Sequence, residues 1–137
     1  ELNPNDGLAG DNWKLRGSSE KAPNPAMQIT VMNSRAIALV AGDKSNWPLA
    51  GDQLYVDLDL SIDNLPPGAQ LAIGAAIIEI SPHPHTGCKK FLARFGEDAV
   101  QFVNSPQGKQ LWLRGLNARI VQPGTIRIGD KVRKLQR

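Results

Sequence analysis

The stretch QLAIGAAIIEISPHPHTGCKKFLARF, residues 70–95, joins a strand-like segment to a helix-like one and carries the only cysteine of the 137 residues. Residues 70–80 are apolar and rich in β-branched side chains, and Ser81 and Pro82 close them, so one long strand is predicted. After the cysteine, apolar side chains recur at helical spacing, and Gly96 is expected to divide this region into two short helices. The apolar positions of the helical pattern are Phe91, Leu92, Phe95, Ala99, Phe102 and Val103. The stretch therefore predicts a strand, a cysteine-bearing loop and two helices, in that order.

Cys88 lies in a polar and basic part of this stretch that also contains glycine and proline. Thr86 is a candidate N-cap, which would place Cys88 in the first turn of the following helix. The free N–H groups and the positive dipole end of a helix favour thiolate over thiol, and Lys89 and Lys90 add positive charge. His85 adds a further charge when it is protonated. These residues predict an activated sulfur. The spacing of His83 and His85 favours loop histidines without a metal, and the alternative is that His85 is a catalytic acid/base or ligand-contacting group.

The residues alone leave a second interpretation of Cys88 open. A free cysteine is commonly a small buried hydrophobic residue that takes no part in chemistry. On that interpretation the chain is a non-catalytic β-barrel that binds an anionic ligand or a partner protein, and Cys88 is structural. The polar, exposed character expected around Cys88 favours the chemical interpretation.

The rest of the sequence predicts many short strands and few helices. Ser34 is expected to cap a short helix at 35–41, which Gly42 and Asp43 end. Alternating or apolar runs predict further strands, and Pro-Gly and Gly-Asp dipeptides supply the corners between them. These strand segments are 27–32 with one face buried, 54–60, 111–113, 118–121 and 126–135. The pattern predicts a mainly β fold, a β-barrel with short helical insertions.

Length, composition and charge limit the possible functions. A chain of 137 residues and 14.8 kDa is expected to be a single domain over residues 1–137. A net charge of +3 and a pI of about 9.3 suit a small anionic ligand but do not indicate nucleic acid. No apolar run approaches the ~20 residues of a membrane span, so no membrane association is expected. One cysteine cannot form an internal disulfide, and a cytoplasmic location is expected. The chain starts at Glu1 without a methionine or a signal pattern, so N-terminal residues of the full protein are expected to be missing.

Several short elements, most of them with glycine, follow one another in a specific order around Cys88. They are Gly7-Leu8-Ala9-Gly10-Asp11, Asn64-Leu65, residues 68–80, the Cys88 segment, Arg114-Gly115, and residues 118–121, 124–126 and 128–130. In this order they resemble the MOSC domain, the C-terminal domain of molybdenum cofactor sulfurases, which also occurs as a free-standing protein. The resemblance covers nearly the whole chain. It implies a β-barrel and a cysteine that either carries sulfur or ligates molybdenum.

The resemblance also implies cofactors and partners. Molybdenum cofactor (molybdopterin) is the expected cofactor, with Cys88 as metal ligand and catalytic residue. The alternative is a sulfur carrier, in which Cys88 exchanges sulfur with a donor or acceptor protein. The activity would be that of a molybdenum-dependent oxidoreductase or a sulfur transferase. Pyridoxal phosphate is linked to the family through the lyase domain of full-length sulfurases, for which this chain leaves no room.

A pterin cofactor carries a phosphate, so cationic side chains are expected to line its cleft. The side chains predicted to make these contacts are those of Arg35, Lys89, Arg94 and Arg114. The Arg114-Gly115 pair taken by itself, however, favours a β-bulge with a solvated arginine. Asp57 and Asp59 share one face of a predicted strand, and a solvated face explains them without any catalytic role. Trp13, Trp47 and Trp112 are interpreted as anchors in or at the rim of the core.

Overall fold

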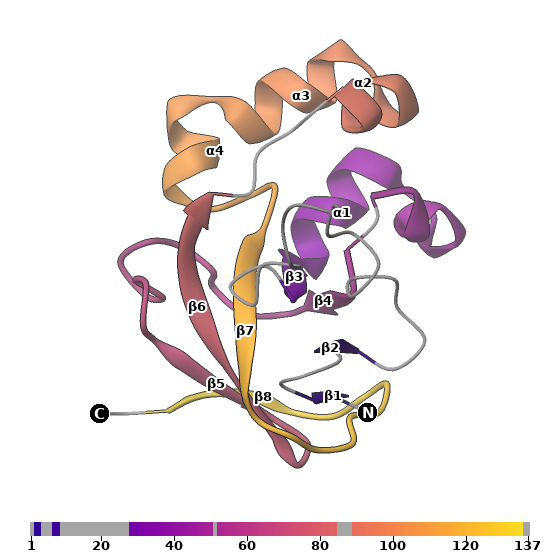
Figure 1. Cartoon of the computed structure of the whole chain (residues 1–137). Coiled ribbons are helices and arrows are strands. Elements are labelled where there is room, and N and C mark those ends of the chain that lie inside the picture. The colour runs from indigo at the N-terminus through magenta and orange to yellow at the C-terminus, as the bar shows by residue number, and fades with distance from the viewer. Residues whose placement is uncertain (1, 4–6, 9–27, 51, 85–88, 136–137) are drawn as a thin grey trace, which may run out of the picture.

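A computed structural model of the chain describes residues 2–3, 7–8, 28–50, 52–84 and 89–135. Within these ranges the main element is a mixed six-stranded sheet that curls into a half-barrel (Figure 1). The strand order is β4-β3-β7-β6-β5-β8; β3 and β4 are parallel, and the other neighbours are antiparallel. The strands are β3 (Ile29–Asn33), β4 (Leu54–Val56), β5 (Gln70–Ile73), β6 (Ala76–Pro84), β7 (Leu116–Gln122) and β8 (Val132–Leu135). The predicted mainly β fold with short helical insertions is confirmed.

Two very short strands, β1 (Leu2–Asn3) and β2 (Gly7–Leu8), pair antiparallel beside this sheet. Leu2 exchanges backbone hydrogen bonds of 2.8 and 3.0 Å with Gly124, and its side chain is fully buried. The first residues described are therefore tied to the half-barrel by both hydrogen bonds and apolar packing.

Short helices cover one end and part of the outer face of the sheet (Figure 1). They are α1 (Ser34–Ala41), the 3-10 helix η3 (Lys44–Ala50), α2 (Lys89–Phe95), α3 (Glu97–Asn104) and α4 (Pro106–Gln110). The division at Gly96 is confirmed, and this glycine has a φ of +92°. The predicted cap of α1 is wrong by one residue, because Asn33 Oδ1 accepts from the N–H groups of Arg35 and Ala36. No helix in the described ranges combines the length and the apolar character needed to cross a bilayer.

The single long strand predicted at 70–80 is wrong, because this segment forms a tight β-hairpin. β5 and β6 pair up to Ile73 and Ala76, so only Gly74 and Ala75 connect them. Gly74 has a φ of +54°, which glycine adopts at little cost. A Cβ at this position would stand 2.6 Å from Asp130 Oδ2. The interior glycine was the sequence signal for the turn, and the continuous apolar pattern around it concealed that signal.

Three other predicted strands differ from the structure in extent or in kind. The segment 111–113 is not a strand: it leaves α4 through a turn in which Trp112 has a φ of +52°. β4 is three residues long and ends at Val56, although the alternation continues to residue 60. Of the run 126–135, only β8 is a strand. Alternation over a few residues indicates which side chains are buried, but strand pairing depends on a neighbouring strand being available.

β3 lies between two hydrophobic cores and is buried on both faces, whereas one buried face was predicted for 27–32. Ile29 and Val31 belong to the core inside the half-barrel. Met32 belongs to a second core, which it forms with Ile37 of α1 and with Ala50. Because α1 and η3 pack on the outer face of β3, the face that the alternating pattern assigned to solvent is buried as well.

Candidate functional site

One edge of the sheet gathers the segments that flank Cys88. β3 and β4 run parallel and end at this edge, and β7 begins there, with Leu116 paired to Val31. β6 also ends there, where Pro84 pairs with Leu116. Helix α2 begins at Lys89, and α2, α3 and α4 lie across this end of the sheet in Figure 1. Residues 85–88, which include the candidates His85 and Cys88 and the predicted cap Thr86, lie outside the described residues, as does the side chain of Lys89.

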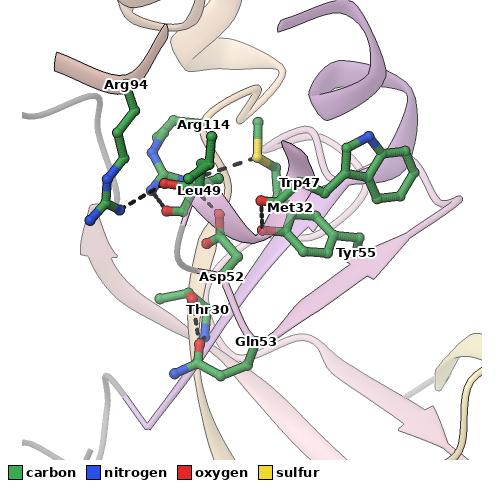
Figure 2. A network of polar contacts seen from close by, with 10 residues as sticks. Thr30, Met32, Trp47, Leu49, Asp52, Gln53, Tyr55, Arg94 and Arg114 are labelled. Atoms are coloured by element: carbon green, nitrogen blue, oxygen red, sulfur yellow. Dashed lines mark hydrogen bonds and ion pairs between the residues drawn. The ribbon is translucent and has the colours of Figure 1, made fainter. Parts of the chain in front are cut away.

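Arg114 precedes β7 and is buried at this edge, as Figure 2 shows. Its Nη1 is 2.6 Å from Asp52 Oδ2, and the two side chains are only 6% and 0% exposed. Its Nη2 donates to the carbonyl oxygen of Ala50 at 2.9 Å. The guanidinium carbon lies 4.8 Å from the centre of the Phe91 ring, a cation–π contact, and Met32 Sδ is 3.9 Å from Nη1. One side chain thus contacts α2, the end of η3, the segment before β4, and β3.

The interpretation of Arg114 as a solvated arginine in a bulge is wrong. Its charge is compensated inside the protein by Asp52, a residue that the sequence reading missed. The pair Gly51-Asp52 resembles an ordinary turn dipeptide, and nothing in its neighbourhood indicates a partner that lies 62 residues away. Gly115, with a φ of +125°, supplies the turn that sends the chain from Arg114 into β7. The prediction that Arg114 contacts a cofactor stays a prediction, but a phosphate there would compete with Asp52.

Arg94 lies near the end of α2 and is exposed. Its Nη1 donates to the carbonyl oxygen of Leu49 at 2.7 Å. Leu49 and Ala50 are consecutive residues, so Arg94 and Arg114 hold neighbouring carbonyl groups at the end of η3 (Figure 2). A guanidinium has five N–H donors, and the exposed position of Arg94 allows the others to contact an anion.

Arg35, the remaining predicted cationic contact, has a different setting. Its Nε lies 3.0 Å from Asp57 Oδ1, and the two side chains are 80% and 67% exposed. This pair lines an open hollow of about 470 Å³ together with Asn33, Leu58 and Asp59. Asp57 and Asp59 are exposed as predicted. Because two carboxylates accompany one guanidinium, this hollow is less suited to a phosphate than the exposed side of α2.

Tyr55 of β4 lies beside the Asp52–Arg114 pair. Its hydroxyl donates to the carbonyl oxygen of Trp47 at 2.7 Å, and the two aromatic rings are 5.5 Å apart. Burial raises the pKa of Tyr55 to about 12; the charge of Asp52 adds to this effect and the charge of Arg114 opposes it. The pKa of Tyr55 therefore depends on the charges of the buried ion pair.

Absorbance titration of the phenol tests this account, because Tyr55 is the only tyrosine in the chain. We expect ionisation in the folded protein with a pKa of about 12. An unfolded tyrosine ionises at a pKa of about 10. Since the folded-state pKa is the higher one, stability from the neutral phenol is complete below pH ~10 and is lost as the pH rises to ~12. Asp52→Asn should lower the pKa of Tyr55, and Glu79→Gln should leave it unchanged. Ionisation of the folded protein at the pKa of free tyrosine would contradict the arrangement.

Comparison with known proteins decides the family. A family model described as "MOSC domain" matches residues 24–133, which is most of the chain. The chain belongs to the MOSC domain family. None of the curated proteins compared with it matches. In the described residues of this MOSC domain, no three His, Cys, Asp or Glu side chains are grouped so that they could hold a metal ion.

Solved structures share the fold of this MOSC domain. YiiM from Geobacillus stearothermophilus is 18% identical with a TM-score of 0.63, over 83% of this chain and 57% of that chain. YiiM from Escherichia coli is 18% identical with a TM-score of 0.59, over 85% of this chain and 58% of that chain. A structure described as a hypothetical protein is 21% identical with a TM-score of 0.66, over 99% of this chain and 59% of that chain. The MOSC domain chain thus spans less than two thirds of the length of each, and the likeness concerns the fold.

Proposed function

We propose that this MOSC domain binds molybdenum cofactor and that the Cys88 thiolate is a ligand of the metal. The observation that carries the proposal is the topology of the sheet edge. The strand that leads to Cys88 ends there at Pro84, and α2, the helix that follows Cys88, begins at Lys89 in the helical layer across this end of the sheet (Figure 1). A soft thiolate suits molybdenum as it suits other soft metal centres. The cofactor, when bound, would supply two-electron redox chemistry, and the protein would supply binding and orientation.

The described residues fit an anionic cofactor on the exposed side of α2. Arg94 is exposed and is held there by its bond to the Leu49 carbonyl, so a phosphate can meet a guanidinium whose position is already restricted. Lys89 begins the same helix and remains a candidate for the same contact. Arg114 would act indirectly, since Asp52 already compensates the charge of its guanidinium. The guanidinium of Arg35 is exposed, but a phosphate bound there would compete with Asp57 for it.

Molybdenum content after expression in a host that makes the cofactor tests the proposal. We expect the metal to co-purify with the wild-type protein and to be lost from Cys88→Ser, which replaces a soft thiolate by a hard hydroxyl. Arg94→Gln should reduce cofactor retention, because it removes a charged donor. Arg119→Gln is the matched control, since Arg119 is an exposed arginine on the sheet that pairs with Glu79. Equal molybdenum in wild type and Cys88→Ser would refute the role of Cys88.

Sulfur transfer is the alternative role for the same thiol. It requires that Cys88 accept sulfane sulfur as a persulfide and pass it to an acceptor. Because the chain has one cysteine, the mass increase of one sulfur atom after incubation with a persulfide donor reports Cys88 alone. A protein without molybdenum that gains this adduct, while Cys88→Ser does not, would be a sulfur carrier. A protein with neither property would be a binding module in which Cys88 is structural.

A further inference from the structure

The short segment 49–52, between η3 and β4, is held from α2 and from the start of β7 at the same time. Arg94 of α2 donates to the Leu49 carbonyl, and Arg114 contacts both the Ala50 carbonyl and the Asp52 carboxylate. Phe91, also of α2, lies against the Arg114 guanidinium. Three contacts therefore connect this part of the chain to α2 and to Arg114, and a fourth connects α2 to Arg114.

Burial of this ion pair needs an explanation, because removing two charges from water costs several kcal/mol per ion before their attraction is counted. Apolar side chains of similar size often fill such a space at no loss of stability. Apolar side chains cannot, however, fix the orientation of the helix and strand segments that they contact. The planar guanidinium of Arg114 bonds to Asp52 and Ala50 through its two Nη atoms while its central carbon lies over the ring of Phe91. This geometry specifies the placement of α2 more closely than apolar contact alone.

Arg114 is also linked to both described ends of the cysteine segment through residues that neighbour those ends. Leu116, two residues after Arg114, pairs with Pro84, where the segment begins. Phe91, two residues after Lys89 and therefore just beyond the segment, has its ring 4.8 Å from the guanidinium carbon. A shift of Arg114 would therefore move the two ends of the segment relative to each other.

We propose that Asp52 is a positioning residue for Pro84 and the start of α2, the two described ends of the cysteine segment, and that it acts through Arg114. Asp52 holds the guanidinium where it contacts both the Phe91 ring and the Ala50 carbonyl, and α2 takes its position from this contact. The inference rests on the proposed function in one respect, namely that Cys88 is the functional thiol. Neither Asp52 nor Arg114 needs to touch a cofactor for this role.

The alkylation rate of Cys88 in the native protein tests the inference. Because the chain has one cysteine, the measured rate reports Cys88 alone. Asp52→Asn leaves Arg114 buried and unpaired, so both the stability and the alkylation rate should change. The double variant Asp52→Asn with Arg114→Met removes both charges and should recover most of the stability. If Asp52 and Arg114 position the segment, this stable double variant still alkylates at a rate that differs from wild type by about tenfold.

The matched control is the partly exposed ion pair of Glu79 and Arg119, whose Oε2 and Nε lie 2.7 Å apart. Glu79→Gln, alone and with Arg119→Met, should alkylate at the wild-type rate. A double variant of Asp52 and Arg114 that regains both the stability and the alkylation rate would show that the pair is merely structural and would overturn the inference. An unchanged rate in all variants would also overturn it.

A further variant keeps the test decisive if the substitutions at Asp52 prevent folding. Arg114→Lys preserves the charge beside Asp52 but lacks the fork that reaches Ala50 as well, so it too should change the alkylation rate. A wild-type rate in folded Arg114→Lys would count against the inference. These measurements need no cofactor. Loss of the molybdenum proposal would therefore leave them valid, and a failure of the positioning role would leave the molybdenum result unaffected.

Discussion

Arg114→Met is expected to lower the free energy of unfolding by about 3–5 kcal/mol, because the Asp52 carboxylate then stays buried without the guanidinium that compensates its charge. The Asp52 side chain is 0% exposed, so it cannot turn to water without opening the segment between η3 and β4. The carbonyl group of Ala50 loses its donor in the same variant. Denaturant unfolding, followed by tryptophan fluorescence, measures the loss. It is a large fraction of the ~5–15 kcal/mol that stabilises a typical domain.

Arg119→Met is the control for this prediction. The Arg119–Glu79 distance of 2.7 Å is nearly that of the Arg114–Asp52 pair, but the side chains are 49% and 19% exposed. Water and salt screen an exposed pair, so a loss of about 0–1 kcal/mol is expected. Equal losses in the two variants would mean that burial does not distinguish them, and the account of the Arg114 pair would be wrong.

Phe91→Ala is expected to lower the free energy of unfolding by about 3–5 kcal/mol, as truncation of a buried aromatic side chain usually does. Phe91 is 2% exposed; its ring lies 4.9 Å from that of Phe95 and 4.8 Å from the Arg114 guanidinium. The substitution removes the main apolar anchor of α2. Hydrogen exchange should therefore accelerate in α2 more than in the central strands β6 and β7.

The next residue provides the comparison. Leu92 is 44% exposed, so Leu92→Ala should change the free energy of unfolding by no more than about 0.5 kcal/mol. A similar loss in Leu92→Ala and Phe91→Ala would indicate that α2 turns a different face to the protein. Uniform acceleration of exchange across the sheet in Phe91→Ala would indicate global rather than local opening.

The predicted cationic contacts were equivalent in the sequence and are not equivalent in the structure. Arg114 is buried and paired, Arg94 is exposed and restrained by one carbonyl group, and Arg35 is exposed beside Asp57. Each difference arises from a partner that comes from another element. The charge of an arginine is evident from its letter, but its availability to a ligand depends on what the fold places beside it.

Local patterns determined the elements that depend on neighbours in sequence. The glycine at position 96 divides α2 from α3, and Gly42 ends α1, because backbone conformation at a glycine is a local property. The short strands and the family motifs gave the mainly β class for the same reason. The turn at Gly74 was also encoded locally, although a continuous apolar run hid it.

The sequence by itself thus determined the mainly β class, the order of most elements and the position of the single cysteine between a strand and a helix. The tertiary structure alone decided that β3 is buried on both faces, that Trp112 sits in a turn, and that Arg114 pairs with Asp52. The physical reason is the distance along the chain over which each effect acts. Periodicity and turn chemistry act over a few residues, whereas burial and ion pairing depend on contacts between segments as far apart as Asp52 and Arg114, 62 residues along the chain.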